Sequence, residues 1–198
     1  MNKRLRARWL KRLHQWHWIS SALCLAGMLL FSITGITLNH AADIEATPVV
    51  RQGTLALPEN WRASLQDDNP SAGLLDWLAS ETDMDTAYAE AQWDDMELYL
   101  SLPRPGGHGW IAIDRETGAV EFEDTDRGLV ALLNDLHKGR DSGVVWFWFI
   151  DIFAVACLVF SLTGLVLLWL HGRHRPATWP ITGAGLILPW LLLLAFVP

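Results

Sequence analysis

Residues 18–42, WISSALCLAGMLLFSITGITLNHAA, decide the fold, because this stretch contains no Asp, Glu, Lys or Arg. A second apolar run, residues 142–170, carries Asp151 as its one charged residue. Each run exceeds the roughly 20 residues with which a helix crosses a bilayer. A third run, 181–197, is interrupted by Pro189 and would rise only about 25 Å. We predict a mainly α-helical membrane protein. Its three transmembrane helices are expected at 16–40, 143–170 and 181–197.

Basic residues predict the orientation, because Lys and Arg beside a span are retained in the cytoplasm. Residues 1–15 contain six of them, and the loop at 171–180 contains Arg173 and Arg175 without an acid. Residues 41–140 instead hold 20 acidic against 7 basic residues. We therefore predict that the N-terminus and the 171–180 loop are cytoplasmic, and that the 41–142 domain and the C-terminus are exported.

A cleaved signal peptide is the alternative interpretation of the first apolar run. Signal peptides have an apolar core of about 7 to 15 residues and a small-residue cleavage site. The run here is longer, and Ala41-Ala42 is a poor cleavage context. A retained helix is the better prediction.

The exported segment changes to the periodicity of a small α+β unit. A capped helix is expected to begin at Asn69-Pro70-Ser71. Two or three strands are predicted, at 96–102, 110–113 and 119–123, with a turn at 114–118 between the last two. The segment carries no phosphate loop, GxSxG or HExxH motif. His108, within Gly106–Gly109, is interpreted as an exposed turn histidine rather than a metal or substrate contact.

An interfacial helix is predicted at 126–138, with Gly139 positioned to end it. Its apolar stripe could face either the membrane surface or the domain core. The stripe consists of Leu129, Leu132, Leu133 and Leu136.

Six of the seven histidines lie at the edges of the two long spans. They are His14, His17, His40, His137, His171 and His174. Haem bound without covalent attachment needs axial nitrogen ligands on opposite faces, which histidines on two facing helices can supply. On the exported side His40 can face His137. On the cytoplasmic side His14 or His17 can face His171 or His174.

The pentapeptide FSxTG occurs in both long spans, at 31–35 and at 160–164. Small residues let a neighbouring helix or a flat macrocycle approach the backbone closely. A helix-packing motif explains the repeat nearly as well when the histidines are ignored. With the histidines included, the motif favours haem pockets.

The choice of ligands on the cytoplasmic side is not settled by helical phase. We favour His17 with His171, and His14 and His174 are the alternatives, either as ligands or as hydrogen-bond partners of the haem propionates. Roughly 34 Å of helix separates His17 from His40. This distance leaves open whether the chain binds one haem or two.

Asp151 is the one formal charge inside a predicted span. An intramembrane carboxylate is a candidate for a proton path or a polar haem contact. A structural pairing with a polar residue of the facing helix is an equal alternative. The candidate partners are Ser32, Thr34 and Asn39.

The sequence resembles the PepSY-associated transmembrane helix family in its short three-span form. The resemblance lies in LHQWHWISSALC (13–24), TGITLNH (34–40), DRETGAV (114–120), LHKGRD (136–141) and SLTGLVLLWLHGRH (161–174). Relatives include inner-membrane reductases of ferric siderophores, which carry haem b and pass electrons outward to Fe(III). The resemblance implies a PepSY-like periplasmic domain, a bacterial inner-membrane location and bis-histidine ligation. The ligands it implies are His14 or His17, His40, His137 and His171.

These features together lead us to expect a ferric reductase for iron uptake, with one or two haem b groups per chain. Its substrate would be periplasmic ferric iron or a ferric siderophore, and the excess of carboxylates suits the hard cation better than an anionic chelate. The chain has no nicotinamide or flavin fingerprint, so a quinol or a cytoplasmic reductase is expected as a separate electron donor. A homodimer could supply the helices that larger relatives have, and no nucleic-acid partner is expected.

Two other functions stay open at this point. The first is a non-enzymatic membrane-anchored sensor or binding module of the PepSY type, whose histidines would be interfacial residues. The second is an iron-transport accessory subunit, in which histidines and Asp151 would line a path.

Overall fold

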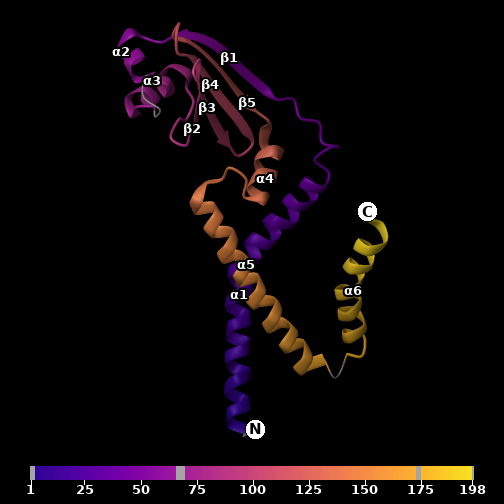
Figure 1. Ribbon diagram of the computed structural model, residues 1–198. Helices are drawn as coiled ribbons and strands as arrows, with labels where there is room; N and C mark the ends of the chain where they lie inside the picture. The colour runs from indigo at the N-terminus through magenta and orange to yellow at the C-terminus, as the bar shows by residue number, and fades with distance from the viewer. Residues whose placement is uncertain (1–2, 66–69, 173–174, 198) are drawn as a thin grey trace. The chain divides into compact units, whose positions relative to one another are not determined.

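The computed structural model describes residues 3–65, 70–172 and 175–197. Among these residues, three helices are long and apolar enough to cross a membrane: α1 (Lys3–Asn39), α5 (Gly143–His171) and α6 (Thr178–Phe196) (Figure 1). A small antiparallel sheet domain lies between α1 and α5 in the chain. The prediction of three apolar helices with an α+β domain after the first is confirmed.

Two compact units make up the chain, and each is described by itself. One consists of Met1–Leu29 with Asp151–Pro198, and the other is Leu30–Ile150. Helices α1 and α5 therefore contribute residues to both units.

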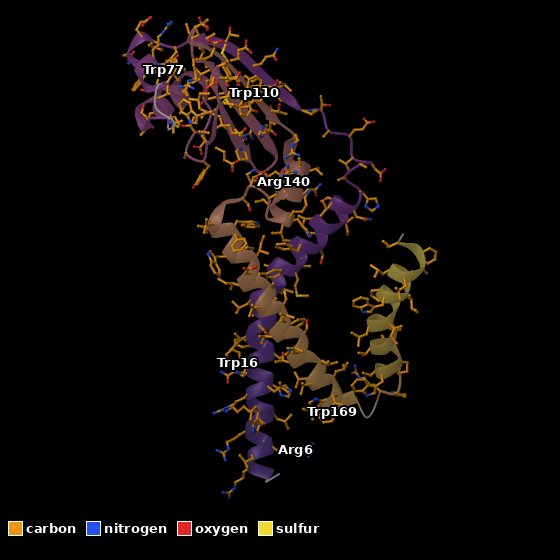
Figure 2. The ribbon with its side chains drawn as sticks, in the orientation of Figure 1. Arg6, Trp16, Trp77, Trp110, Arg140 and Trp169 are labelled. Carbon is orange, nitrogen blue, oxygen red and sulfur yellow. The ribbon has the colours of Figure 1, made fainter. Side chains whose placement is uncertain are left out.

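Helix α1 begins at Lys3, so the basic N-terminal residues continue the apolar helix. Lys, Arg and Leu are good helix formers, and neither Pro nor Gly occurs before Gly27. Trp16 on α1 and Trp169 on α5 are exposed, and Figure 2 shows both on the surfaces of their helices. Exposed tryptophans at the ends of apolar helices are typical of residues that lie at a membrane interface.

The approach of α1 to α5 depends on Gly27. A Cβ atom at this position would overlap the ring of Phe153, with the ring Cζ only 2.9 Å away. One turn earlier, Cys24 is fully buried. Small residues of this kind allow membrane helices to pack closely.

We predict that Gly27→Leu destabilises the protein by about 1–3 kcal/mol, because the added side chain overpacks this contact. Gly185→Leu on α6 is the matched control, since no described atom lies within 4 Å of a Cβ built there. Thermal unfolding of the two purified variants in detergent measures the difference. Equal stability of both variants would contradict the close contact at Gly27.

The sheet domain contains one five-stranded antiparallel sheet with the strand order β1-β5-β4-β3-β2. Its strands are β1 (Val49–Ala56), β2 (Glu90–Trp93), β3 (Glu97–Arg104), β4 (Gly107–Asp114) and β5 (Ala119–Asp126). Three short helices complete the domain: α2 (Glu59–Arg62), the 3₁₀ turn at Ala63–Leu65, and α3 (Ala72–Thr82), with α2 and α3 labelled in Figure 1.

The domain core forms on one face of this sheet. Strand residues alternate between the two faces, which brings one set of apolar side chains together with those of α3 and the 3₁₀ turn. The set includes Leu98, Leu100, Ile111, Ile113 and Val120 from the strands and Leu65, Leu74 and Leu78 from the helical side. Burial of these residues provides the main driving force for the domain.

Strands β3, β4 and β5 confirm the three predicted strands. Strands β1 and β2 were not predicted, because they are edge strands whose residues are mostly exposed and lack a clear alternation of apolar and polar residues. The helix after Ser71 is also confirmed: the Ser71 hydroxyl accepts a hydrogen bond from the Leu74 N–H at 3.3 Å. Asn69 lies outside the described residues.

The prediction for His108 is partly wrong. This residue is exposed, but it lies in β4, opposite Pro103 and Thr125, and not in a turn. The turn comes earlier, at Gly106, which has φ +74°, as the third residue of a type II turn requires.

The predicted turn at 114–118 is confirmed. The Asp114 carboxylate accepts hydrogen bonds from the Glu116 and Thr117 N–H groups at 3.0 and 2.7 Å. The bond from Thr117 is the main reason that the pKa of Asp114 lies below its usual value.

Helix α4 (Gly128–Lys138) matches the predicted interfacial helix and ends at Gly139, which has φ +67°. Part of its apolar stripe faces α1: Leu133 and Leu136 line a small hollow with Leu30 and Phe31. Leu129 at the start of the stripe is exposed. Leu132 lies instead against Gly106 of the β3–β4 turn, so the stripe is divided between α1 and the sheet domain.

Hydrogen bonds also hold α4 in place. The buried Asp135 carboxylate accepts hydrogen bonds from Gly106 N–H at 2.9 Å and from the Arg127 guanidinium at 2.6 Å. Asn134 accepts a hydrogen bond from the Thr37 hydroxyl of α1 at 3.1 Å. Helix α4 is therefore bonded both to the β3–β4 turn and to α1.

Candidate functional site

His17 of α1 is enclosed by the FSxTG motif of α5. The Phe160 ring stacks on the imidazole, with centroids 4.9 Å apart and planes inclined by 13°. His17 Nδ1 lies 3.0 Å from Thr163 Oγ1 and 3.2 Å from the Phe160 carbonyl oxygen. A Cβ atom at Gly164 would lie only 3.2 Å from His17 Cε1. We call Phe160, Thr163 and Gly164 the His17 clamp.

The FSxTG motif of α1 surrounds a different histidine in the same way. His137, from α4, has its ring centroid 5.0 Å from that of Phe31, and its Nδ1 lies 2.7 Å from Thr34 Oγ1. A Cβ atom at Gly35 would lie 3.5 Å from His137 Cε1. We call Phe31, Thr34 and Gly35 the His137 clamp.

The two clamps show what the repeated motif does in this chain. From the sequence we expected the small residues of the motif to let a helix or a macrocycle approach. In the structure, the group that approaches each glycine is an imidazole ring. The contacts of Phe and Thr were not predicted. The signal that could have revealed them is the repeat itself, since an identical Phe, Thr and Gly in two helices suggests an identical partner. The serines of the motif, Ser32 and Ser161, are exposed.

His17 and His171 line one hollow of about 400 Å³. His171 is exposed at the end of α5, and its Nδ1 lies 3.0 Å from the Leu167 carbonyl oxygen. His14 contacts His171 edge to face at 5.7 Å, and its Nδ1 lies 2.9 Å from the Leu10 carbonyl oxygen. Three of the four predicted residues of this group therefore lie together. The fourth, His174, lies outside the described residues.

The remaining predicted residues have different surroundings. His40 is exposed just after α1, with Nδ1 3.0 Å from the Ile36 carbonyl oxygen. The hollow beside His137 has a volume of about 20 Å³, which is room for about one water molecule. Asp151 is exposed on α5.

The five described histidines at the helix ends share one property that matters for metal binding. In each ring Nδ1 lies within hydrogen-bond distance of an oxygen, so Nε2 is the nitrogen that is left for a metal. The five are His14, His17, His40, His137 and His171.

A haem group fits the surroundings of His17 and His171. The volume of their hollow falls within the range of about 300–1,000 Å³ that is usual for cofactor sites. Gly164 and Arg175 line the same hollow, and Arg175 offers a cation for a carboxylate such as a haem propionate. The one-water hollow beside His137 does not accommodate a macrocycle, so we derive no step through a haem there.

The three apolar helices, with a sheet domain inserted between the first two, are typical of a membrane protein. The PepSY_TM-like family model matches residues 8–198. The chain therefore belongs to this family, and the match includes both clamps. No curated protein and no solved structure matches the chain.

Proposed function

We propose that this protein is a haem b-containing ferric reductase of the bacterial inner membrane. The observation that carries the proposal is the arrangement of His17 and His171 at one hollow of about 400 Å³, with the Nδ1 of each ring bonded to oxygen. This arrangement leaves the Nε2 atom of each ring available, so His17 and His171 would hold the haem iron, and the haem would supply one-electron redox chemistry.

The roles of the residues follow from their surroundings. His17 is held by its clamp and supplies the ordered ligand, while the exposed His171 can move to complete the pair. Arg175 would bind a propionate, and Gly164 lets the imidazole of His17 lie close to α5. His14, beside His171, is the alternative ligand, and His40 with His137 is proposed as a second pair only if two haems are found.

The acidic domain is the proposed location of the substrate. Fe³⁺ is a hard cation that prefers carboxylate oxygens, and the 41–140 segment has 20 acidic against 7 basic residues. The electron donor is proposed to be separate, either a quinol or a cytoplasmic reductase. Helix α6 has no buried residue, and Asp151 is exposed on an apolar helix. A carboxylate that faces lipid is costly, and a second copy of the chain would cover both Asp151 and α6. Both features therefore favour a homodimer.

The test is the dithionite-reduced minus oxidised absorption spectrum of the purified full-length protein, with haem quantified per chain. We expect bis-histidine b-type bands and one haem per chain, retained in His40→Ala. Two haems per chain would support the second pair at His40 and His137. Colourless protein from cells that make and insert haem would overturn the reductase proposal.

A second candidate function is a non-enzymatic sensor or binding module. The observation that favours it is the hydrogen-bonded connection from Gly106 of the β3–β4 turn through Asp135 and α4 to Thr34 of α1. A ligand on the sheet domain could shift α4 through this connection. This candidate predicts a colourless protein in which His17→Ala and His171→Ala leave ligand binding unchanged.

A further inference from the structure

The hydroxyl group of Thr163 can only accept a hydrogen bond from His17. A hydroxyl has one hydrogen to donate. Thr163 Oγ1 lies 2.6 Å from the Val159 carbonyl oxygen, closer than the 3.0 Å to His17 Nδ1. Since a carbonyl cannot donate, Thr163 donates to its own helix.

The tautomer of His17 follows from this. Thr163 faces Nδ1 of His17 with a lone pair, so this Nδ1 carries the hydrogen. In a neutral imidazole the other nitrogen, Nε2, then has the free lone pair. The Phe160 carbonyl, 3.2 Å from His17 Nδ1, imposes the same tautomer, because it too can only accept.

We propose that Thr163 is a positioning residue that holds His17 in the Nδ1–H form and thereby sets the affinity and reduction potential of the haem. This inference rests on the proposed function. A hydrogen bond from Nδ1–H to an acceptor raises the basicity of the ligating nitrogen, and loss of such a partner usually lowers metal affinity about 10- to 100-fold. The stacked Phe160 ring and the close approach of the imidazole to Gly164 restrict the plane of the imidazole.

The recurrence of the same contacts at the second motif supports a positional role rather than a chance contact. In the His137 clamp a threonine, a phenylalanine and a glycine at identical motif positions contact one imidazole. The serine at the second motif position is exposed in both clamps. Ser161 therefore offers a control of similar size within the same five residues.

The experiment compares Thr163→Val, Thr163→Ser and Ser161→Ala in the haem-loaded full-length protein. Valine keeps the shape of threonine but removes the hydroxyl acceptor. The Phe160 carbonyl is then the acceptor that remains for the Nδ1–H of His17. We expect haem affinity to fall about 10-fold, at the lower end of the usual range. Because the ligand becomes less basic, the oxidised state is favoured less and the reduction potential rises. A tenfold change in the redox equilibrium corresponds to about 59 mV for one electron.

Haem titration of the apo-protein and a spectroelectrochemical titration give the two values. Thr163→Ser, which keeps an acceptor, and Ser161→Ala should both match the wild-type protein. Complete loss of haem from Thr163→Val, with retention in Thr163→Ser, would also support the inference. An unchanged affinity and potential in Thr163→Val would overturn it and leave the proposed function standing. Wild-type protein without haem would overturn the proposed function, and the inference would fall with it.

Discussion

His17→Gly is expected to abolish haem binding, with a loss of affinity well beyond the about 100-fold that removal of a ligand's hydrogen-bonded neighbour can cost. His17 is the ring that its clamp holds in place, with Nδ1 3.0 Å from Thr163 Oγ1. Neither His14 nor His171 has comparable support, because each bonds only its own helix through Nδ1. Haem content per chain, from the absorption spectrum of the purified variant, measures the effect.

Two controls separate loss of a ligand from loss of structure. Added imidazole should enter the space left in His17→Gly and restore the bis-nitrogen spectrum, which a misfolded protein would not allow. His14→Ala should retain haem, since His14 is exposed and lies outside the clamp. Loss of haem in His14→Ala with retention in His17→Gly would reverse the assignment and make the His17 clamp a helix-packing contact.

The apolar helices could be predicted from the sequence because the signal is local. A long run without charge, such as 18–42, has few structural alternatives. The core strands β3, β4 and β5 were predictable for a similar reason, since they alternate between apolar and polar residues. Strand β1 pairs with β5, whose residues lie some seventy positions later in the chain. The residues of β1 show little alternation between apolar and polar side chains. The position of β1 in the sheet therefore depends on its pairing with β5, which the sequence around β1 does not reveal.

The candidate site was predicted less completely, because its contacts join distant parts of the chain. The sequence drew attention to histidines at helix ends and to the repeated FSxTG motif. It did not show that Thr163 would bond His17, because helical phase cannot be carried between two helices whose crossing is unknown. His137 was expected to face His40, and this pairing stays a prediction. The structure adds that His137 contacts the motif of α1, through Thr34.

Removal of the Asp135 carboxylate is expected to have the largest effect on the stability of the sheet domain. Asp135→Ala leaves the buried Gly106 N–H and the Arg127 guanidinium without their acceptor. An unsatisfied buried donor costs about 1–3 kcal/mol, and loss of one partner of a buried ion pair costs more. The Arg127 side chain is 37% exposed and can regain water, which reduces that second cost. We expect a loss of about 2–4 kcal/mol.

Urea unfolding of the detergent-solubilised protein, followed by tryptophan fluorescence, measures this change. Asp76→Ala on α3 is the matched control, because Asp76 is an exposed helical aspartate and such substitutions usually stay within about 0.5 kcal/mol. Arg127→Ala should be less costly than Asp135→Ala, since Asp135 still accepts from Gly106. The double variant should cost less than the sum of the two, because both remove the same ion pair. Additive effects would mean that Asp135 stabilises the domain only through its hydrogen bond with the Gly106 N–H. The ion pair between Asp135 and Arg127 would then not hold α4 in place.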